Sequence, residues 1–343
     1  MKKLLNTLYI TSRDAYLHRQ GETVVVKIDG EERIRVPIHN LDSIICFGPM
    51  TCSTPLMELC GTRNVHLAFF SEYGKFYARV EGPIHGNVLL RKRQFAVANQ
   101  PDLCTNLAKS FVLAKMSNSR NVLLRAAREH SDATASGELK SAAGKLTRIA
   151  QTLPDAANVS VLRGIEGEAA RTYFSVFNHL IVAQKEDFYY SSRSRRPPLD
   201  NVNAMLSFVY TVLGNDVRSA LQGVGQDPAV GFFHADRPGR ASLALDVLEE
   251  FRAYLADRLV LTLINRQQVK SSGFRKSPSG SVLMDDETRK LLLSTYQKRK
   301  QEEIQHPFLN ENIPLGLLPH VQALLLARYL RGDLDAYPAF CWK

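Results

Sequence analysis

The spacing of the apolar residues changes once along the chain, near residues 82–87, and this change constrains the fold most strongly. Before it, short runs rich in β-branched residues alternate with turn residues, a pattern typical of β-strands. After it, apolar residues recur mostly every three or four positions, which is typical of helices. We therefore expect an α+β protein with a small N-terminal β-rich domain, residues 1–84, followed by a larger all-α domain, residues 85–343.

Turn residues separate the expected elements. Asp29-Gly30 stands between two candidate strands and is a strong signal for a β-hairpin. Two basic loops, at 191–198 and 271–281, interrupt the helical part. The candidate strands are 8–10, 23–28, 33–38, 43–47, 65–70 and 76–80; a short helix is expected at 55–60, and long helical segments at 106–128, 164–183, 201–221, 242–263 and 286–305.

Basic residues outnumber acidic ones by 44 to 34, which gives a net charge of +10. Such a surplus favours a polyanionic partner, because a protein that neutralises phosphates releases their condensed counterions. A single basic cluster is usually a solvated helix face or loop, but clusters scattered through a folded chain favour a distributed DNA-binding surface. The clusters are Arg91-Lys92-Arg93, Arg193 with Arg195 and Arg196, Arg275-Lys276, and Lys298-Arg299-Lys300.

Two classes of protein do not fit this sequence. No apolar run is long enough to cross a bilayer, and no cleavable signal follows the basic N-terminus, so we expect a cytoplasmic protein without a membrane partner. The five cysteines are odd in number and form no CxxC pair. Buried free thiols in a reducing compartment explain them better than a zinc site does.

The first candidate site residue is Glu166. On a helix it shares a face with Ala170, Tyr173 and Phe177, whereas Glu168 faces the solvent side. A carboxylate on an apolar face needs a cation, a hydrogen-bond partner or a proton. Two interpretations stay open here: a functional site, or a structural ion pair with a nearby arginine such as Arg163.

A second group of candidates lies between residues 231 and 252. His234 ends an apolar run and enters a Pro-Gly loop, where a histidine is more often a core residue than a ligand. Asp246 and Glu249 stand three positions apart on the following helix and therefore share a face. Two like charges at the edge of a core repel each other, and a divalent cation relieves this repulsion. Carboxylates with one imidazole suit Mg²⁺ or Mn²⁺, and manganese tolerates the imidazole more readily.

Three segments together resemble the CRISPR-associated protein 1 family: 162–174, 200–210 and 231–252. The resemblance extends over the whole chain, and the tail and overall length are most similar to the type I-C branch. It implies that Glu166, His234 and Glu249 hold the metal, although several relatives have aspartate at the last position. It also implies that Asp246 lies close to the site, with a supporting or catalytic role.

The resemblance further implies DNA contacts and partners. Arg237 and Arg240 are then placed to meet phosphate, and the basic clusters at Arg193, Arg195, Arg196, Arg275 and Lys276 extend the DNA-binding surface. The partner is double-stranded DNA, both a captured spacer duplex and a repeat array. Family members form homodimers through the β domain and assemble with CRISPR-associated protein 2. Branches like this one often also use CRISPR-associated protein 4.

The implied chemistry is transesterification, in which a 3′-hydroxyl of the captured duplex attacks a phosphodiester at the repeat and a metal ion stabilises the phosphate. Two alternatives remain. One is a stand-alone metal-dependent nuclease acting on branched DNA. The other is a non-catalytic basic DNA-binding scaffold, in which Glu166, His234, Asp246 and Glu249 form structural ion pairs. The scaffold would bind DNA whether or not metal is removed.

Overall fold

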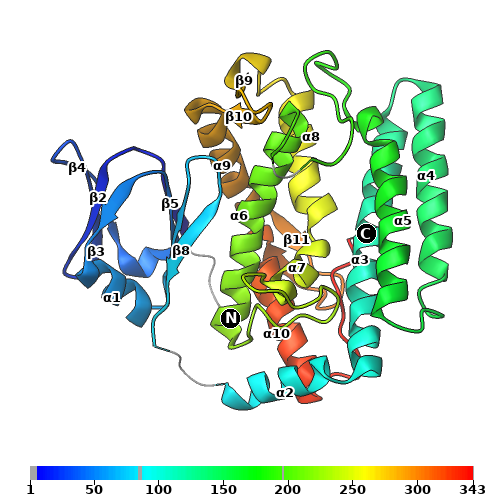
Figure 1. Cartoon of the computed structure of the whole chain (residues 1–343), viewed down its shortest axis with the longest axis horizontal. Coiled ribbons are helices and arrows are strands. Elements are labelled where there is room, and N and C mark those ends of the chain that lie inside the picture. Colours follow the sequence, from blue (N-terminus) through cyan, green and yellow to red (C-terminus); the bar gives the residue numbers. More distant parts are fainter. Residues whose placement is uncertain (1–5, 84–86, 195–196, 343) are drawn as a thin grey trace. The chain divides into compact units, whose positions relative to one another are not determined.

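The computed structural model describes residues 6–83, 87–194 and 197–342. The chain divides into two compact units. The N-terminal unit comprises Met1–Gly86 together with Met284–Glu302, and the helical unit comprises Asn87–Leu283 together with Glu303–Lys343. A β-rich beginning followed by a largely helical remainder confirms the expected α+β class (Figure 1).

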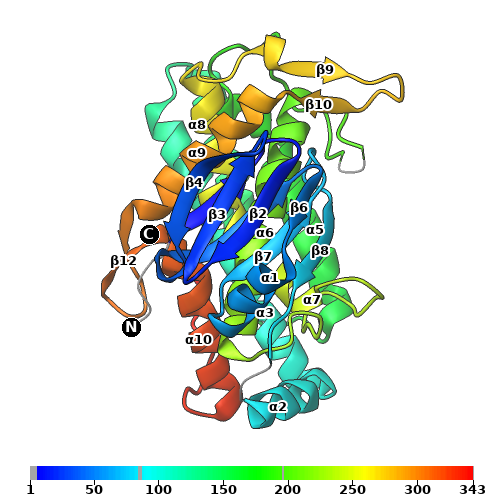
Figure 2. The same cartoon turned by 90° about the vertical axis from the view of Figure 1, so that its left-hand side faces the viewer.

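The described part of the N-terminal unit contains two four-stranded sheets. The first has the order β1-β5-β7-β8, with β1 (Asn6–Ile10), β5 (Leu41–Phe47) and β7 (His66–Phe70) parallel and β8 (Phe76–Val80) antiparallel to β7. The second has the order β4-β3-β2-β6 and is seen in Figure 2. It consists of β2 (Ala15–Gln20), β3 (Thr23–Ile28), β4 (Glu31–Pro37) and β6 (Met50–Cys52), and helix α1 (Thr54–Thr62) follows it.

The hairpin expected at Asp29-Gly30 joins β3 to β4 and is confirmed. Both residues have positive φ, 53° and 81°, the conformation that Asp-Gly adopts in a two-residue hairpin turn. Strand β2 was not predicted, because its second half, His18-Arg19-Gln20, is polar and breaks the apolar alternation. Its first half still contributes Ala15 and Leu17, both fully buried, to the core of the unit.

Helix α9 (Asp286–Gln301) groups with the N-terminal unit, which the predicted division at residues 84 and 85 did not anticipate. The guanidinium of Arg289 lies 5.4 Å from the ring centroid of Tyr73, and Lys300 Nζ donates to Thr7 Oγ1 over 3.3 Å. Helical periodicity reports which face of a helix is apolar, but not which part of the chain covers that face.

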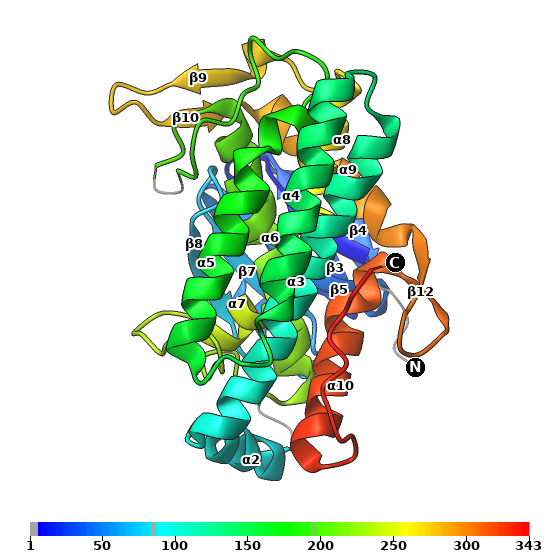
Figure 3. The same ribbon diagram turned by 90° about the vertical axis from the view of Figure 1, so that its right-hand side faces the viewer.

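The helical unit is built around long helices. Helices α3 (Pro101–Glu129), α4 (Ala133–Gln151) and α5 (Val159–Ser175) pack side by side (Figure 3). Helix α6 (Asn201–Val224) packs against α7 (Ser242–Glu249) and α10 (Leu318–Arg331), and α2 (Val88–Ala98) packs against α3 and α10. Polar side chains cap the starts of α5 and α6: Asn158 accepts from Val161 N, and Asp200 accepts from Asn203 N.

Several predicted helices are shorter than expected. The segment 242–263 is three pieces, α7, a π-helical stretch (Arg252–Asp257) and α8 (Arg258–Asn265). The segment 164–183 ends as α5 at Ser175, and 286–305 ends as α9 at Gln301. Four short strands also occur that the helical spacing did not indicate: β9 (Phe274–Lys276) with β10 (Val282–Met284), and β11 (Glu303–Gln305) with β12 (Asn312–Pro314). Within the described ranges, no helix combines the length and apolar character that crossing a bilayer requires.

Candidate active site

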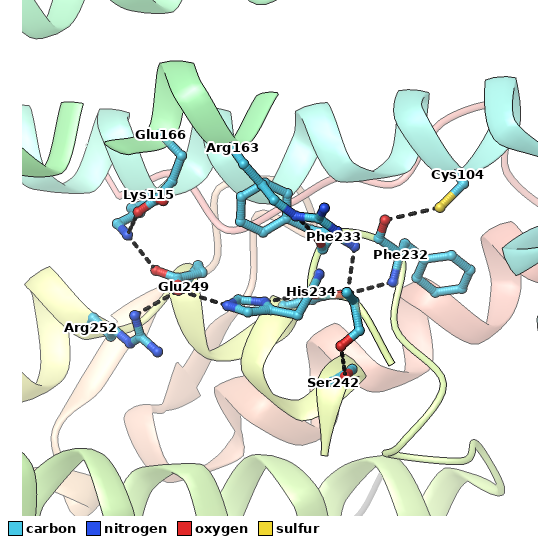
Figure 4. A network of polar contacts seen from close by, with 12 residues as sticks. Cys104, Lys115, Arg163, Glu166, Phe232, Phe233, His234, Ser242, Glu249 and Arg252 are labelled. Carbon is cyan, nitrogen blue, oxygen red and sulfur yellow. Dashed lines mark hydrogen bonds and ion pairs between the residues drawn. The ribbon is translucent and has the colours of Figure 1, made fainter. Parts of the chain in front are cut away.

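Four of the predicted site residues lie near one another within the helical unit, and Figure 4 labels three of them, Glu166, His234 and Glu249. Glu166 lies on α5, His234 in the loop between α6 and α7, and Asp246 and Glu249 on α7. Figure 4 also shows Lys115, which comes from the middle of α3 and was not predicted from the sequence. Segments far apart in the sequence therefore converge here.

Asp246 holds the histidine loop in place. Its fully buried carboxylate accepts from the backbone N–H of Phe232 at 2.6 Å, of Phe233 at 3.0 Å and of His234 at 2.9 Å. It also accepts from His234 Nδ1 at 2.7 Å. Because a carboxylate only accepts, Nδ1 carries the hydrogen, and Nε2 is the nitrogen left to bind a ligand. The arrangement supports a positioning role for Asp246.

Gly231 makes this close approach possible. A Cβ at this position would lie 2.7 Å from Ser242 Cβ, closer than real Cβ atoms come, and 3.0 Å from Asp246 Oδ2, which is a tight contact. The backbone of the loop can therefore reach the first turn of α7 only without a side chain at residue 231. This steric requirement explains why glycine begins the apolar run that ends in His234.

Glu249 is a buried carboxylate surrounded by cations. Its side chain is 2% exposed, and its Oε1 accepts from Arg252 Nη1 at 2.6 Å. Its Oε2 lies 2.8 Å from Lys115 Nζ, and His234 Nε2 lies 3.8 Å from Oε1. Burial by itself would raise the pKa of this carboxyl, but Arg252, Lys115 and His234 together lower the pKa to about 2. Glu249 is therefore ionised throughout the neutral range.

Lys115 joins Glu249 to Glu166, because its ammonium forms an ion pair with both carboxylates. Glu166 therefore forms an ion pair, but with Lys115 and not with the arginine, Arg163, that the sequence suggested. Arg163 instead donates from Nε and Nη2 to the carbonyl oxygen of Phe233, at 3.1 and 2.8 Å. A signal for Lys115 was present in the sequence: it follows Phe111 by four positions and Val112 by three, so it lies beside the buried stripe of α3.

The donor set suits a divalent cation, although the described residues include no ready-made group of three histidine, cysteine or acidic ligands. A cation already lies between the carboxylates of Glu166 and Glu249. In addition, Glu249 Oε2 is buried and accepts no hydrogen bond of good geometry, so it retains capacity for a ligand bond. Glu166, His234 and Glu249 could therefore hold a metal ion, provided that the ammonium of Lys115 gives way.

The basic residues predicted to bind DNA differ in their surroundings. Arg237, Arg275 and Lys276 are exposed, and Arg240 is half-buried. Arg193 is bound into the fold: its Nη1 donates to Asn203 Oδ1 at 2.6 Å, and its guanidinium lies 5.3 Å from the ring centroid of Tyr210. Arg195 and Arg196 lie outside the described residues.

Comparisons of the sequence give one consistent family. A model of the family described as CRISPR associated protein Cas1 matches residues 8–298. A protein of Chlorobaculum tepidum named CRISPR-associated endonuclease Cas1 1 is 50% identical over 343 residues, 100% of both chains. A Rhodospirillum rubrum protein named CRISPR-associated endonuclease Cas1 2 is 49% identical over 347 residues, again 100% of both. A Cas4 exonuclease/Cas1 endonuclease fusion of Geobacter sulfurreducens is 35% identical over 342 residues, 97% of this chain and 60% of the fusion.

Solved structures share the fold. A CAS1 protein from Thermotoga maritima superposes with a TM-score of 0.82 at 23% identity, covering 96% of this chain and 98% of that one. A chain of a Cas6-RT-Cas1–Cas2 complex superposes with a TM-score of 0.84 at 22% identity, covering 100% of this chain and 36% of that one. The two-part architecture described above is therefore an established fold.

Proposed function

The chain belongs to the CRISPR-associated Cas1 family, and from this we propose that it is a metal-dependent DNA endonuclease and integrase of CRISPR adaptation. It inserts short duplexes, the spacers, into a repeat array. Two relatives that match the whole chain at 50% and 49% identity are named endonucleases, which supports the cutting activity. The structural observation that supports the proposal is the cluster in which Lys115 pairs with the carboxylates of Glu166 and Glu249 while His234 Nε2 lies 3.8 Å from Glu249 Oε1.

The proposed reaction is attack by a 3′-hydroxyl of the captured duplex on a phosphodiester of the repeat. A divalent ion bound by Glu166, His234 and Glu249 would polarise that phosphodiester and stabilise its developing charge. Asp246 orients the imidazole of His234, which presents Nε2 on the side of Glu249. No covalent intermediate with the protein is needed, since the attacking group comes from the DNA.

We propose Mg²⁺ or Mn²⁺ as the ion. Two carboxylates and one imidazole form a mixed oxygen and nitrogen donor set, and manganese accepts the imidazole more readily than magnesium does. The ionised state of Glu249 near neutral pH supports binding of such an ion without the release of a proton from this group.

The proposed DNA surface extends from the site to the basic loops. Arg237 and Arg240 lie in the segment between His234 and α7, and Arg275 and Lys276 form part of β9. Phosphate contacts of this kind hold the duplex without reading its sequence. We further propose Arg195 and Arg196 as contacts, on the basis of their place in the basic segment 191–198.

The proposed partners follow from the family. We propose that the protein forms a homodimer through its N-terminal unit and assembles with CRISPR-associated protein 2. A solved relative belongs to a Cas1–Cas2 complex, which supports this assembly. A relative fused to a Cas4 exonuclease supports a further partnership with CRISPR-associated protein 4. The tail and length support placement in the type I-C branch.

The test uses the purified protein with CRISPR-associated protein 2, Mn²⁺ and a leader-repeat substrate. A short duplex with free 3′-hydroxyls should be joined to the repeat, and one with dideoxy ends should not, because the attacking oxygen is missing. His234→Ala and Glu166→Ala should each abolish joining while leaving DNA binding nearly unchanged. Glu168→Ala is the matched control, since Glu168 lies on the same helix but is exposed and should tolerate the change.

The same experiment separates the alternatives. A hydrolytic nuclease for branched DNA would cut equally well with blocked and free ends, because it uses water. A DNA-binding scaffold would show no metal-dependent strand chemistry at all, and chelation would leave its binding unaltered. The ion pairs of Glu166 and Glu249 with Lys115 favour the scaffold, and chelation therefore decides between it and the enzyme.

A further inference from the structure

We infer that Lys115 is an internal counter-ion of the metal site, which holds the two carboxylates in the metal-free protein and which a divalent ion has to displace. The inference rests on the proposed metal-dependent function and names the residue that regulates occupancy of that site. Lys115 is thereby a determinant of metal affinity, in addition to the three proposed ligands.

The position of Lys115 supports this role. Its side chain extends from α3 to Glu166 on α5 and to Glu249 next to the end of α7, as Figure 4 shows. The Lys115 side chain is 14% exposed and that of Glu249 is 2% exposed. A carboxylate so deeply buried is strongly destabilising without a nearby cation. In the absence of metal, the ammonium therefore holds the two acidic side chains close together.

A metal ion and the ammonium of Lys115 would compete for the same oxygen atom of Glu249. Glu249 Oε1 is taken by Arg252 Nη1 at 2.6 Å, whereas Oε2 lies 2.8 Å from Lys115 Nζ and accepts no hydrogen bond of good geometry. Oε2 is therefore the oxygen that a metal ion would use. An ion bonded to this oxygen at about 2.1 Å would lie within a few ångströms of the ammonium, where the repulsion between the two cations is large. Both cations cannot occupy this position together.

Lys115 is also the cation that can leave. A lysine carries its charge at the end of a flexible four-carbon chain, so it can swing away without movement of its helix. Arg252 is held more firmly, because its guanidinium lies 5.3 Å from the ring centroid of Tyr210. The hydroxyl of Tyr210 in turn donates to the buried Asp257 at 2.5 Å. One of the two cations is thus anchored to Glu249, and the other is exchangeable.

The test measures Mn²⁺ binding to the full-length, metal-stripped protein by calorimetric titration, together with the melting temperature with and without Mn²⁺. Lys115→Met should bind Mn²⁺ at least about tenfold more tightly, since removing a neighbouring positive charge changes ionic equilibria at a carboxylate by at least about one logarithmic unit. It should also melt at a lower temperature than wild type without metal and recover with Mn²⁺. Lys115→Gln keeps a hydrogen-bond donor and should show the same tightening, which guards against a folding defect in the methionine variant.

Lys109→Met is the matched control. Lys109 lies on the same helix and donates to the carbonyl oxygen of Pro154 at 2.8 Å, away from the carboxylates. Its substitution should leave Mn²⁺ affinity unchanged. Equal or weaker Mn²⁺ binding by both Lys115 variants, with wild type binding normally and Glu166→Ala binding poorly, would overturn the counter-ion role alone. Absence of saturable Mn²⁺ binding to wild type would overturn the proposed metal site and the role of Lys115 with it.

Discussion

Glu249 and Glu250 are adjacent in the sequence and both are buried, yet their surroundings are opposite. Glu249 faces the site, where Arg252, Lys115 and His234 approach it, and its pKa falls to about 2. Glu250 faces the C-terminal segment and meets neutral donors. Burial raises the pKa of the Glu250 carboxyl to about 7, although the hydrogen bonds that it accepts oppose this rise.

The neutral donors around Glu250 come from separate parts of the helical unit. Tyr337 Oη donates to Oε1 at 2.6 Å, and Phe340 N and Gln322 Nε2 donate to Oε2 at 2.6 and 2.8 Å. Asn118 also links the two segments, because its Nδ2 donates to the backbone carbonyl oxygens of both Glu250 and Phe340. The carboxyl of Glu250 therefore links the C-terminal segment, through Tyr337 and Phe340, to the chain directly after α7.

The comparison shows that burial alone does not determine the protonation state of a carboxyl group, because the charge and hydrogen bonds of its neighbours also act on its pKa. The pocket around Glu249 is built to hold a charged carboxylate, which suits a metal ligand. The pocket around Glu250 is built to satisfy a nearly neutral one, which suits a structural contact. Under the proposed function, Glu249 would serve the metal site, whereas its chemically identical neighbour Glu250 stabilises the fold.

The largest expected effect is on catalysis, and it should distinguish the two residues. Glu249→Gln should lower the rate of metal-dependent strand cutting at least about a hundredfold, because even residues that only support metal ligands cost ten- to a hundredfold when replaced. Glu250→Gln should leave the rate per folded molecule close to wild type. Cutting rates at saturating Mn²⁺, with folding checked by circular dichroism, measure both. Comparable losses in the two folded variants would erase the functional distinction between the pockets.

The next effect concerns pH and a third buried acid, Asp257, which resembles Glu250. It accepts from Tyr173 Oη at 3.0 Å and Tyr210 Oη at 2.5 Å, and burial raises its pKa from 3.8 to about 6. Below pH 3.8 the folded and unfolded states are both protonated at this group. Between 3.8 and 6 the unfolded state loses its proton first, so the contribution to stability falls as the pH rises and is lost above about 6.

Asp257→Asn removes this titration, so wild type and variant should differ in the pH dependence of their unfolding free energy. The difference should amount to at most about 3 kcal/mol between the two ends of the window, since one pKa unit corresponds to about 1.4 kcal/mol. Urea unfolding at several pH values from 4 to 7.5 measures it. Parallel curves for the two proteins would mean that Asp257 is already ionised at low pH in the fold, like Glu249.

Features that depend on local pattern were predictable from the sequence. Runs of β-branched residues predicted the strands of the N-terminal unit other than β2 and β6. Asp29-Gly30 predicted its hairpin, and the apolar faces singled out Glu166 and Glu249. The three-residue spacing of Asp246 and Glu249 predicted that they share one face of a helix, and in the structure both lie close to His234.

Features that depend on which distant segments meet were not predictable. The spacing of Lys115 placed it beside the buried stripe of its helix, but nothing in the sequence indicates that it meets Glu166, which lies 51 residues later. Grouping of α9 with the N-terminal unit depends on contacts such as that of Lys300 with Thr7, which periodicity does not encode. The hydrogen bonds of Tyr337 and Phe340 with Glu250 could not be predicted either, because the sequence does not indicate where the C-terminal segment packs.

The smallest expected effect tests the neutral pocket by itself. Tyr337→Phe removes the hydroxyl that donates to Glu250 Oε1 and accepts from Gln322 Nε2 at 2.9 Å, while it keeps the ring that packs 5.3 Å from that of Phe111. Packing should persist, so the cost is that of buried groups left without a partner, about 1–2 kcal/mol of unfolding free energy. Tyr189→Phe, at a tyrosine that is 51% exposed, should change stability by less than about 0.5 kcal/mol. Urea unfolding of both variants measures these values.

Mn²⁺-dependent cutting by folded Tyr337→Phe should remain near wild type, because none of the cations around Glu249 is altered. A drop in cutting without a loss of stability would instead mean that the C-terminal segment tunes the active site directly, and the division between a charged functional pocket and a neutral structural one would have to be abandoned.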